Sequence, residues 1–291
     1  MINLSIIIAT KDRAALLDGA LASLARQDAA PPFEIIVVDN GSTDATRVVA
    51  ASHPVTYIYE PVPNRGLARN RGLAAATGSH VLFVDDDVVV PPQFLAAHAS
   101  AHARSIFPQA VSGPILNVPA PDVRPLPSAL NFSNAFFCTC NVSVPLAALR
   151  AAGGFDASFD LYGWEDTELG VRLRNRDVGR IFAWDAYLWH IKPPATETLA
   201  AALGKTIEKA RMAARFVTRA PSRRARLATG AYAANLVLGR ALGPRFLQPL
   251  FAGLATSERV PPLVASLARA RLLDSVYVEE LSRALADGPD R

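Results

Sequence analysis

Short apolar runs that end in polar residues recur along the first 85 residues of the chain. Leu4–Ala9 and Phe33–Val38 are two such runs, and each is followed by polar side chains. Runs of this kind favour strands that are buried on both faces of a mostly parallel sheet. Between the two runs, apolar residues recur at helical spacing, at Ala14, Leu17, Leu21 and Leu24. The pattern therefore predicts a strand–helix–strand unit.

The alternation continues to residue 84. It predicts a helix over 44–52, a strand over 56–59, a helix over 67–76 and a strand over 80–84. Four strands with three intervening helices indicate an α/β fold with a doubly wound, mostly parallel sheet of the nucleotide-binding type. Ligands of such sheets bind at the carboxyl ends of the strands, so the polar residues that follow each strand are candidate site residues.

Beyond Pro91-Pro92 the alternation weakens. The proline-rich stretch 108–127 predicts a long connection over the sheet that faces the substrate. From about residue 196 the chain is rich in Ala, Leu and Arg, with breaks at Pro221, Pro244 and Pro261-Pro262, which predicts four helices. We therefore expect a catalytic domain over 1–195 and a basic helical region over 196–291.

The formal charge of +4 hides an asymmetry between these parts. Residues 1–200 carry 15 basic and 19 acidic residues, a balance of −4, whereas residues 201–291 carry 15 and 7, a balance of +8. Lys205–Lys209 and Arg211–Arg215–Arg219 are spaced four apart, which aligns them along a helix. One interpretation is a surface for anionic membranes, and the other is a solvated basic face, a lid or a dimer surface. No interleaved aromatic residues favour base stacking, so no nucleic-acid partner is expected.

The two cysteines and the amino-terminal residues bear on the compartment. Cys138 and Cys140 are one residue apart, where strand geometry would direct them to opposite faces. Two thiols do not complete a metal site by themselves, and they favour a reducing compartment. The first residues resemble no secretion signal, and no apolar run reaches 18 residues. We expect a cytoplasmic protein that binds peripherally to the inner face of the cell membrane.

Three consecutive carboxylates, Asp85, Asp86 and Asp87, follow the apolar run 81–84. Adjacent carboxylates repel each other unless a cation lies among them. Oxygen ligands favour Mg²⁺ or Mn²⁺, usually shared with substrate phosphates. The alternative is a solvated acidic turn, but Val88–Val90 directly downstream indicates an enclosed one.

Two other strand ends carry candidate donor-binding groups. Asp39 enters a tight turn, where its carboxylate could accept hydrogen bonds from a base or ribose, although a simple turn with a helix cap explains it equally. Thr10 follows the first strand at the adjacent crevice. In the segment 64–72, Arg69 or Arg71 could hold a diphosphate as a bidentate fork, or could belong to a basic helix surface.

A fourth motif combines Gly163 and Trp164 with the acidic pair Glu165 and Asp166. Paired carboxylates beside an aromatic residue suit a general base near the face of a sugar. The start of a helix, expected over 166–175, would keep either acid ionised. The same acids could simply cap that helix, which would explain one of them.

These four motifs, in this order and spacing, resemble family 2 glycosyltransferases of the GT-A fold over about residues 3–192. The resemblance implies transfer of a sugar, with inversion, from a UDP-sugar or another nucleotide-sugar to a hydroxyl of a saccharide or lipid-linked acceptor. It also implies dependence on Mn²⁺ or Mg²⁺ and a role in the synthesis of polysaccharides, glycolipids or other cell-surface glycans.

The resemblance assigns roles to individual residues. Thr10 and Asp39 correspond to nucleoside-binding positions, Arg69 lies near the donor ribose or diphosphate, and Asp85 and Asp86 also face the donor. Asp85 and Asp87 form the Asp-x-Asp motif and bind the metal, and Asp166 is the catalytic base. Trp164 and Glu165 correspond to acceptor-facing positions. His190 lies where some bacterial members have a histidine that completes the metal site, although a lone histidine is also commonly a core residue.

Two other functions fit part of the pattern. One is a non-catalytic module of the same fold that binds a nucleotide-sugar or a membrane, but the complete acidic set argues against it. The other is a nucleotidyltransferase, which would normally have a glycine-rich phosphate loop after the first strand, and residues 9–13 have none. Without a Gln-x-x-Arg-Trp motif or spanning helices, the chain resembles the non-processive members.

Overall fold

The computed structural model describes residues 3–133, 137–193, 197–257 and 259–288. By its internal contacts the chain divides into two compact units, one of residues 1–160 with 165–195 and one of residues 161–164 with 196–291. The expected boundary between residues 195 and 196 lies outside the described residues. The short segment Leu161–Trp164 belongs to the second unit, although it lies within the expected catalytic domain.

A seven-stranded sheet forms the centre of the first unit, in the order β3-β2-β1-β4-β8-β6-β9. The four strands β3, β2, β1 and β4 are parallel, as the alternating pattern predicts, whereas β8 is antiparallel to both β4 and β6. The strands are β1 (Leu4–Thr10), β2 (Phe33–Asp39), β3 (Thr56–Tyr59), β4 (His80–Val84), β6 (Gln109–Ser112), β8 (Asn141–Pro145) and β9 (Gly179–Phe182).

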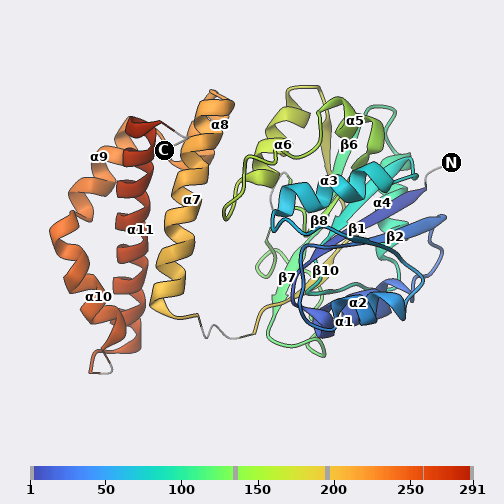
Figure 1. Ribbon diagram of the computed structural model, residues 1–291, viewed down its shortest axis with the longest axis horizontal. Coiled ribbons are helices and arrows are strands. Elements are labelled where there is room, and N and C mark those ends of the chain that lie inside the picture. Colours follow the sequence, from blue (N-terminus) through green and yellow to red (C-terminus); the bar gives the residue numbers. More distant parts are fainter. Residues whose placement is uncertain (1–2, 134–136, 194–196, 258, 289–291) are drawn as a thin grey trace. The chain divides into compact units, whose positions relative to one another are not determined.

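Helices cover both faces of this sheet, so the predicted doubly wound α/β fold is confirmed. One apolar core contains Leu17, Leu21 and Phe94 against one face, and a second contains Leu73 and Leu149 against the other. Figure 1 shows α1 and α2 on one side of the sheet and α3 on the other. The helices are α1 (Ala14–Leu24), α2 (Thr46–Ala51), α3 (Arg65–Ala75), α4 (Phe94–Ala103), α5 (Leu146–Ala151) and α6 (Glu165–Arg174).

A second sheet is formed by three strands that follow β4 in the chain. In sheet order they are β5 (Val88–Val89), β10 (Leu188–Ile191) and β7 (Ile115–Val118). The long connection predicted over 108–127 contains two short strands, β6 and β7, that the pattern did not predict. Gly113 separates these two strands. A Cβ atom there would lie 1.8 Å from the backbone oxygen of Ala186, so only glycine permits this close approach.

The second unit is helical, with α7 (Leu199–Arg219), α8 (Arg223–Thr229), α9 (Ala233–Leu242), η1 (Arg245–Leu247), α10 (Gln248–Thr256) and α11 (Pro262–Asp287). Within the described residues this makes five α-helices and one 3₁₀ turn, so the prediction of four helices is wrong. The missed break is Gly230, which ends α8 in the left-handed conformation with φ of 73°. No helix in the described part of the chain is long and apolar enough to cross a membrane.

Candidate active site

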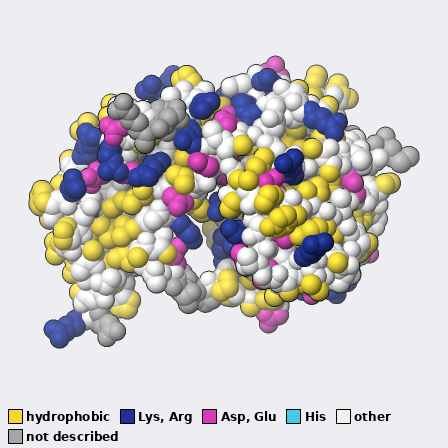
Figure 2. Space-filling model, viewed as in Figure 1, with side chains coloured by type: hydrophobic (Ala, Val, Ile, Leu, Met, Phe, Trp, Pro, Cys, Tyr) yellow, Lys and Arg dark blue, Asp and Glu magenta, His cyan; other side chains and the backbone are white. Residues whose placement is uncertain are grey.

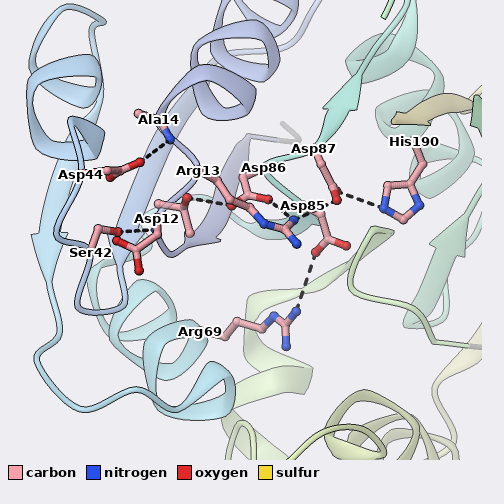
Figure 3. A network of polar contacts seen from close by, with 11 residues as sticks. Asp12, Arg13, Ala14, Ser42, Asp44, Arg69, Asp85, Asp86, Asp87 and His190 are labelled. Carbon is pink, nitrogen blue, oxygen red and sulfur yellow. Dashed lines mark hydrogen bonds and ion pairs between the residues drawn. The ribbon is translucent and has the colours of Figure 1, made fainter. Parts of the chain in front are cut away.

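The strand registers bring distant polar residues together at one edge of the first unit. Val84 pairs with Asn141 in the antiparallel β4–β8 ladder, so Asp85 and Cys140, the next residues, lie opposite each other. Val88 pairs with His190 in β5–β10, and the Ile191 amide donates to the backbone oxygen of Asp87 at 2.8 Å. The three predicted metal ligands, Asp85, Asp87 and His190, therefore meet at one place (Figure 3).

Thr10 and Asp86 lie at the ends of the neighbouring strands β1 and β4. The Thr10 hydroxyl donates to Asp86 Oδ2 at 2.7 Å. Arg13 donates to Asp86 Oδ1 at 3.0 Å and to Asp87 Oδ2 at 2.9 Å, and its side chain is about half exposed, at 48%. Burial raises the pKa of Asp86 despite these hydrogen bonds. Asp86 is thus fixed by a hydrogen bond from the end of the first strand. Arg13 adds a positive charge beside it, and the sequence motifs had assigned no role to this residue.

Asp87 is buried against His190. Burial alone would raise the pKa of Asp87, but His190, Arg13 and Lys192 together lower it below its ordinary value. Asp87 Oδ1 is buried and lies 3.0 Å from His190 Nε2, a contact that is an ion pair when the ring is protonated. A buried, ionised oxygen needs a positive charge or a hydrogen-bond donor nearby.

The orientation of the His190 ring explains this arrangement. His190 Nδ1 lies 3.2 Å from Asn117 Oδ1, and the two residues are paired in the β7–β10 ladder. When Asn117 Oδ1 accepts from Nδ1–H, the neutral ring has its lone pair on Nε2, facing Asp87 Oδ1. A proton or a divalent cation between these two atoms would satisfy both. The residues present therefore fit the metal that the Asp-x-Asp motif implies, and Asn117 would orient His190 if the histidine were a ligand.

Arg69 connects the Asp85 side of the site with the start of α6. Its guanidinium lies 3.7 Å from Asp85 Oδ1 and 3.1 Å from Glu165 Oε1, and it stacks over the Phe155 ring at 5.5 Å. Burial alone would lower the pKa of Arg69, but Glu165, Asp85 and Asp166 raise it above its ordinary value. A permanently charged, buried guanidinium therefore lies among three carboxylates.

Asp166 is in the first turn of α6, partly buried. Burial and the charge of Glu165 raise its pKa to about 6, although Arg69 and hydrogen bonds from Thr167 act in the opposite direction. A carboxylate with a pKa close to the working pH is suited to take a proton from a hydroxyl. Glu165 forms the ion pair with Arg69, so the two acids have different environments.

Asp39 lies at the opposite end of the crevice, where β2 ends. Its Oδ1 accepts from the Ser42 amide at 2.8 Å and its Oδ2 accepts from the Tyr57 hydroxyl at 2.7 Å. Burial and the bond to Asp39 raise the pKa of Tyr57 to about 12. The carboxylate is 2% exposed and fixed by its own unit. Thr10 pairs with Asp39 across the β1–β2 ladder, so the two predicted nucleoside contacts are neighbours.

Trp164 makes its contacts in the second unit. Its indole N–H donates to the Lys209 backbone oxygen at 2.9 Å, the Lys209 ammonium lies 5.5 Å from the ring centre, and Phe216 lies beside it. Trp164 has φ of 75°, a left-handed conformation that is rare outside glycine, and it directly precedes the acidic pair Glu165 and Asp166. Its predicted contact with the acceptor stays a prediction.

The cysteine prediction is wrong in its geometry. Cys138 and Cys140 lie in a turn before β8 rather than in a strand, and both pack against the same apolar core. Cys140 is buried with its sulfur close to Asp85 and His190. No local pattern indicated this proximity, because the β4–β8 pairing that creates it joins residues more than 50 positions apart.

Together these features define the class of protein. A doubly wound sheet with an acidic cluster after β4, a buried arginine beside it and a carboxylate at the start of α6 is the arrangement of a GT-A domain. The Glycosyl transferase family 2 description matches residues 5–110. The chain belongs to the family 2 glycosyltransferases.

Curated relatives agree with this assignment. Validoxylamine A glucosyltransferase of Streptomyces hygroscopicus subsp. limoneus is 31% identical over an alignment of 239 positions, and the match covers 67% of this chain and 52% of the relative. The glycosyltransferase YfnE of Bacillus subtilis is 35% identical over 103 residues, 34% of this chain and 26% of the relative. The chain thus spans about half the length of the first relative and about a quarter of the length of the second.

Solved structures share the fold. A mannosyltransferase from Pyrobaculum calidifontis, in complex with GDP-Man and Mn²⁺, superposes with a TM-score of 0.62 at 20% identity, covering 97% of this chain and 86% of that one. TarS of S. aureus in complex with UDP-GlcNAc has a TM-score of 0.54 at 20% identity, covering 97% of this chain and 91% of the other.

Proposed function

We propose that this chain transfers a sugar from a nucleoside diphosphate sugar to an acceptor hydroxyl, with inversion and with help from Mn²⁺ or Mg²⁺. The observation that carries the proposal is the buried Asp87 oxygen that lies 3.0 Å from His190 Nε2, next to Asp85, at the edge where a nucleotide would lie. Structural neighbours of the same fold bind GDP-Man or UDP-GlcNAc, which supports a nucleotide-sugar as the donor.

The donor side of the proposal uses residues at the ends of β1, β2 and β4. Asp39 and Thr10 would contact the nucleoside, and Arg69 would contact the ribose or diphosphate. Arg13 is half exposed and lies on Asp86 and Asp87, so it is available to contact the diphosphate as well. Asp85, Asp87 and His190 would hold the metal, which when bound neutralises charge on the leaving diphosphate.

Asp166 would act as the general base. Its carboxylate takes the proton of the acceptor hydroxyl, and the acceptor oxygen attacks the anomeric carbon on the face opposite the diphosphate. The bond between that carbon and the diphosphate oxygen breaks in the same step, which inverts the configuration. Glu165 keeps Arg69 in place and raises the pKa of Asp166 toward neutrality. We assign Glu165 and Trp164 to the acceptor side.

Thermal unfolding tests the donor and metal parts of this proposal. We expect a nucleoside diphosphate together with Mn²⁺ to raise the melting temperature more than either alone, since both bind only the folded state. Asp87→Asn keeps the size of the side chain but removes its charge, and should lose this joint stabilisation. If no nucleoside diphosphate stabilises the wild-type protein, the proposal is wrong.

We further propose that the acceptor is a saccharide or a lipid-linked sugar at the inner face of the membrane, in the synthesis of cell-surface glycans, and that the helical unit docks there. Part of the predicted basic stripe is paired internally, through Lys205–Glu197 at 2.7 Å and Arg211–Glu280 at 2.8 Å. The exposed cations Arg219, Arg223 and Arg224 lie at the end of α7 and the start of α8. Exposed apolar residues also occur in this unit, including Leu227, Leu238 and Phe246. Figure 2 shows apolar side chains on the visible face of the helical unit.

A further inference from the structure

A thiol lies inside the candidate metal site. One ligand atom each from Asp85, Cys140 and His190 lies within 4.8 Å of the other two. Atoms on opposite sides of one ion are separated by about 4–5 Å, because metal–ligand distances are about 2.0–2.3 Å. The three atoms therefore surround a space that suits a single ion.

The position of the thiol follows from the fold. Asn141 pairs with Val84 at the end of β4, so Cys140 is opposite Asp85, the first residue of the acidic motif. Asn141 is fixed in turn, because its side chain donates to the Ala186 backbone oxygen at 2.8 Å and accepts from His98 at 3.0 Å. Cys140 is 3% exposed and has little freedom to turn away.

A second observation points to a ligand at this place. Asp87 is 7% exposed, and its buried Oδ1 faces His190 Nε2 at 3.0 Å, a contact that only a proton or a cation between the two atoms makes favourable. The site therefore offers carboxylate oxygens, an imidazole nitrogen and a sulfur. Hard ions such as Mg²⁺ prefer oxygen, whereas Zn²⁺ and Cd²⁺ also favour imidazole and thiolate ligands.

We propose that Cys140 is a ligand of the metal site formed with Asp85, Asp87 and His190, and that the site therefore binds Zn²⁺ and Cd²⁺ through a thiolate. The Sγ–metal bond forms as the thiol proton is released to solvent. These ions would compete with Mn²⁺ or Mg²⁺ for the same position. The inference rests on the metal site of the proposed function.

Titration of the metal-free protein with Cd²⁺ tests the ligand directly, because thiolate binding produces an ultraviolet sulfur-to-cadmium absorption band. We expect one equivalent of Cd²⁺ to produce the band in the wild type. Cys140→Ser should abolish it and weaken Cd²⁺ binding on the order of 100-fold, since a neutral hydroxyl replaces a thiolate. Cys138→Ser is the matched control, because the chain has two cysteines and this one lies outside the cluster.

A second variant keeps the inference testable if Cys140→Ser fails to fold. His190→Ala leaves both thiols in place and should weaken the Cd²⁺ affinity measured from the band. A band that survives in Cys140→Ser, that disappears in Cys138→Ser, or that is absent from the wild type overturns the inference. Sugar transfer with Mg²⁺ but no cadmium band would overturn this inference and leave the proposed transfer standing. A Cys140-dependent band without use of any nucleotide-sugar would overturn the proposed transfer and leave this inference standing.

Discussion

The charge state of individual residues in the site depends on their neighbours as well as on their residue type. Glu165 and Asp166 are adjacent acids, yet one is paired with Arg69 and the other has its pKa raised to about 6 by burial and by the charge of Glu165. In the proposed function, this difference separates the positioning acid Glu165 from the general base Asp166.

The pH dependence of transfer should report that separation. Because Asp166 must be ionised to accept a proton, activity should fall as the pH drops through about 6. Glu165→Gln removes the negative charge that raises this pKa, so the acidic limb of kcat/KM should move to lower pH. The limb should be measured at saturating metal, over the pH range in which the protein is stable. If it is unchanged in Glu165→Gln, the acidic limb does not report the ionisation of Asp166.

Asn117 should act on the metal through His190. Asn117→Leu removes the acceptor for Nδ1–H and should weaken Mn²⁺ binding about tenfold, as loss of an outer partner of a ligating histidine does. Asn117→Asp keeps an acceptor oxygen and should restore most of the affinity. Calorimetric titration with Mn²⁺ distinguishes the three proteins, and equal affinities would rule out this positioning role.

The four motif groups were predictable because the residues of each lie within a few positions of one another along the chain, and two of the groups directly follow an apolar run. Arg13, Asn117 and Cys140 were not, because what marks them is a contact across the sheet. Arg13 contacts carboxylates more than 70 positions away, and Asn117 is paired with His190 by strand register alone. Sequence periodicity holds no information on such pairings.

At the scale of elements, the apolar runs predicted the parallel half of the sheet well. The bounds of β3 and β4 agree with the prediction, and α2 and α3 are displaced by one or two residues. The antiparallel strand β8 and the short strands β6 and β7 were missed. β6 and β7 are four residues long and lie among prolines, which removed the periodic signal. Gly230 was missed as a helix end because a single glycine is also tolerated within helices.

The interface between α4 and β8 contains a buried network that should destabilise the protein in acid. His98 bonds to Ser143 at 2.8 Å and to Asn141 at 3.0 Å, and His102 bonds to Ser143 at 2.8 Å. Burial lowers the pKa of His98 to about 4 and that of His102 to about 3. The network therefore requires neutral rings.

The unfolded chain takes up protons on these histidines near pH 6.5, whereas the folded chain resists until about pH 4. The free energy of unfolding should consequently fall as the pH decreases across this window. Urea unfolding at several pH values measures the slope, and His102→Gln should make it shallower. An equal slope in the variant would mean that carboxylates alone cause the acid sensitivity.

At the scale of the whole molecule, an acidic catalytic unit is joined to a basic helical one. The negative charge of residues 1–200 includes the clusters at 85–87 and 165–166, which belong to the site, and the +8 of residues 201–291 lies outside the family match. The negative charge of residues 1–200 therefore comes in part from the candidate site, whereas the positive charge of residues 201–291 has another origin.

Binding to vesicles tests the membrane role of the helical unit. The protein should sediment with anionic vesicles at low salt and not with zwitterionic ones, because each basic residue near such a surface contributes about 1 kcal/mol. Replacing Arg219, Arg223 and Arg224 by Gln should reduce binding strongly. Replacing Arg26, Arg47 and Arg104 removes the same charge from the first unit and serves as the control. Equal losses in both variants would contradict a dedicated surface.

The central claim is sugar transfer at this site, and the most direct measurement is release of nucleoside diphosphate from a panel of nucleotide-sugars with Mn²⁺. The account predicts that wild-type protein consumes at least one donor, and that Asp166→Asn still binds it but turns it over about 10²–10⁴-fold more slowly. Turnover by Asp166→Asn at the wild-type rate, or no consumption of any donor by the wild type, would contradict it.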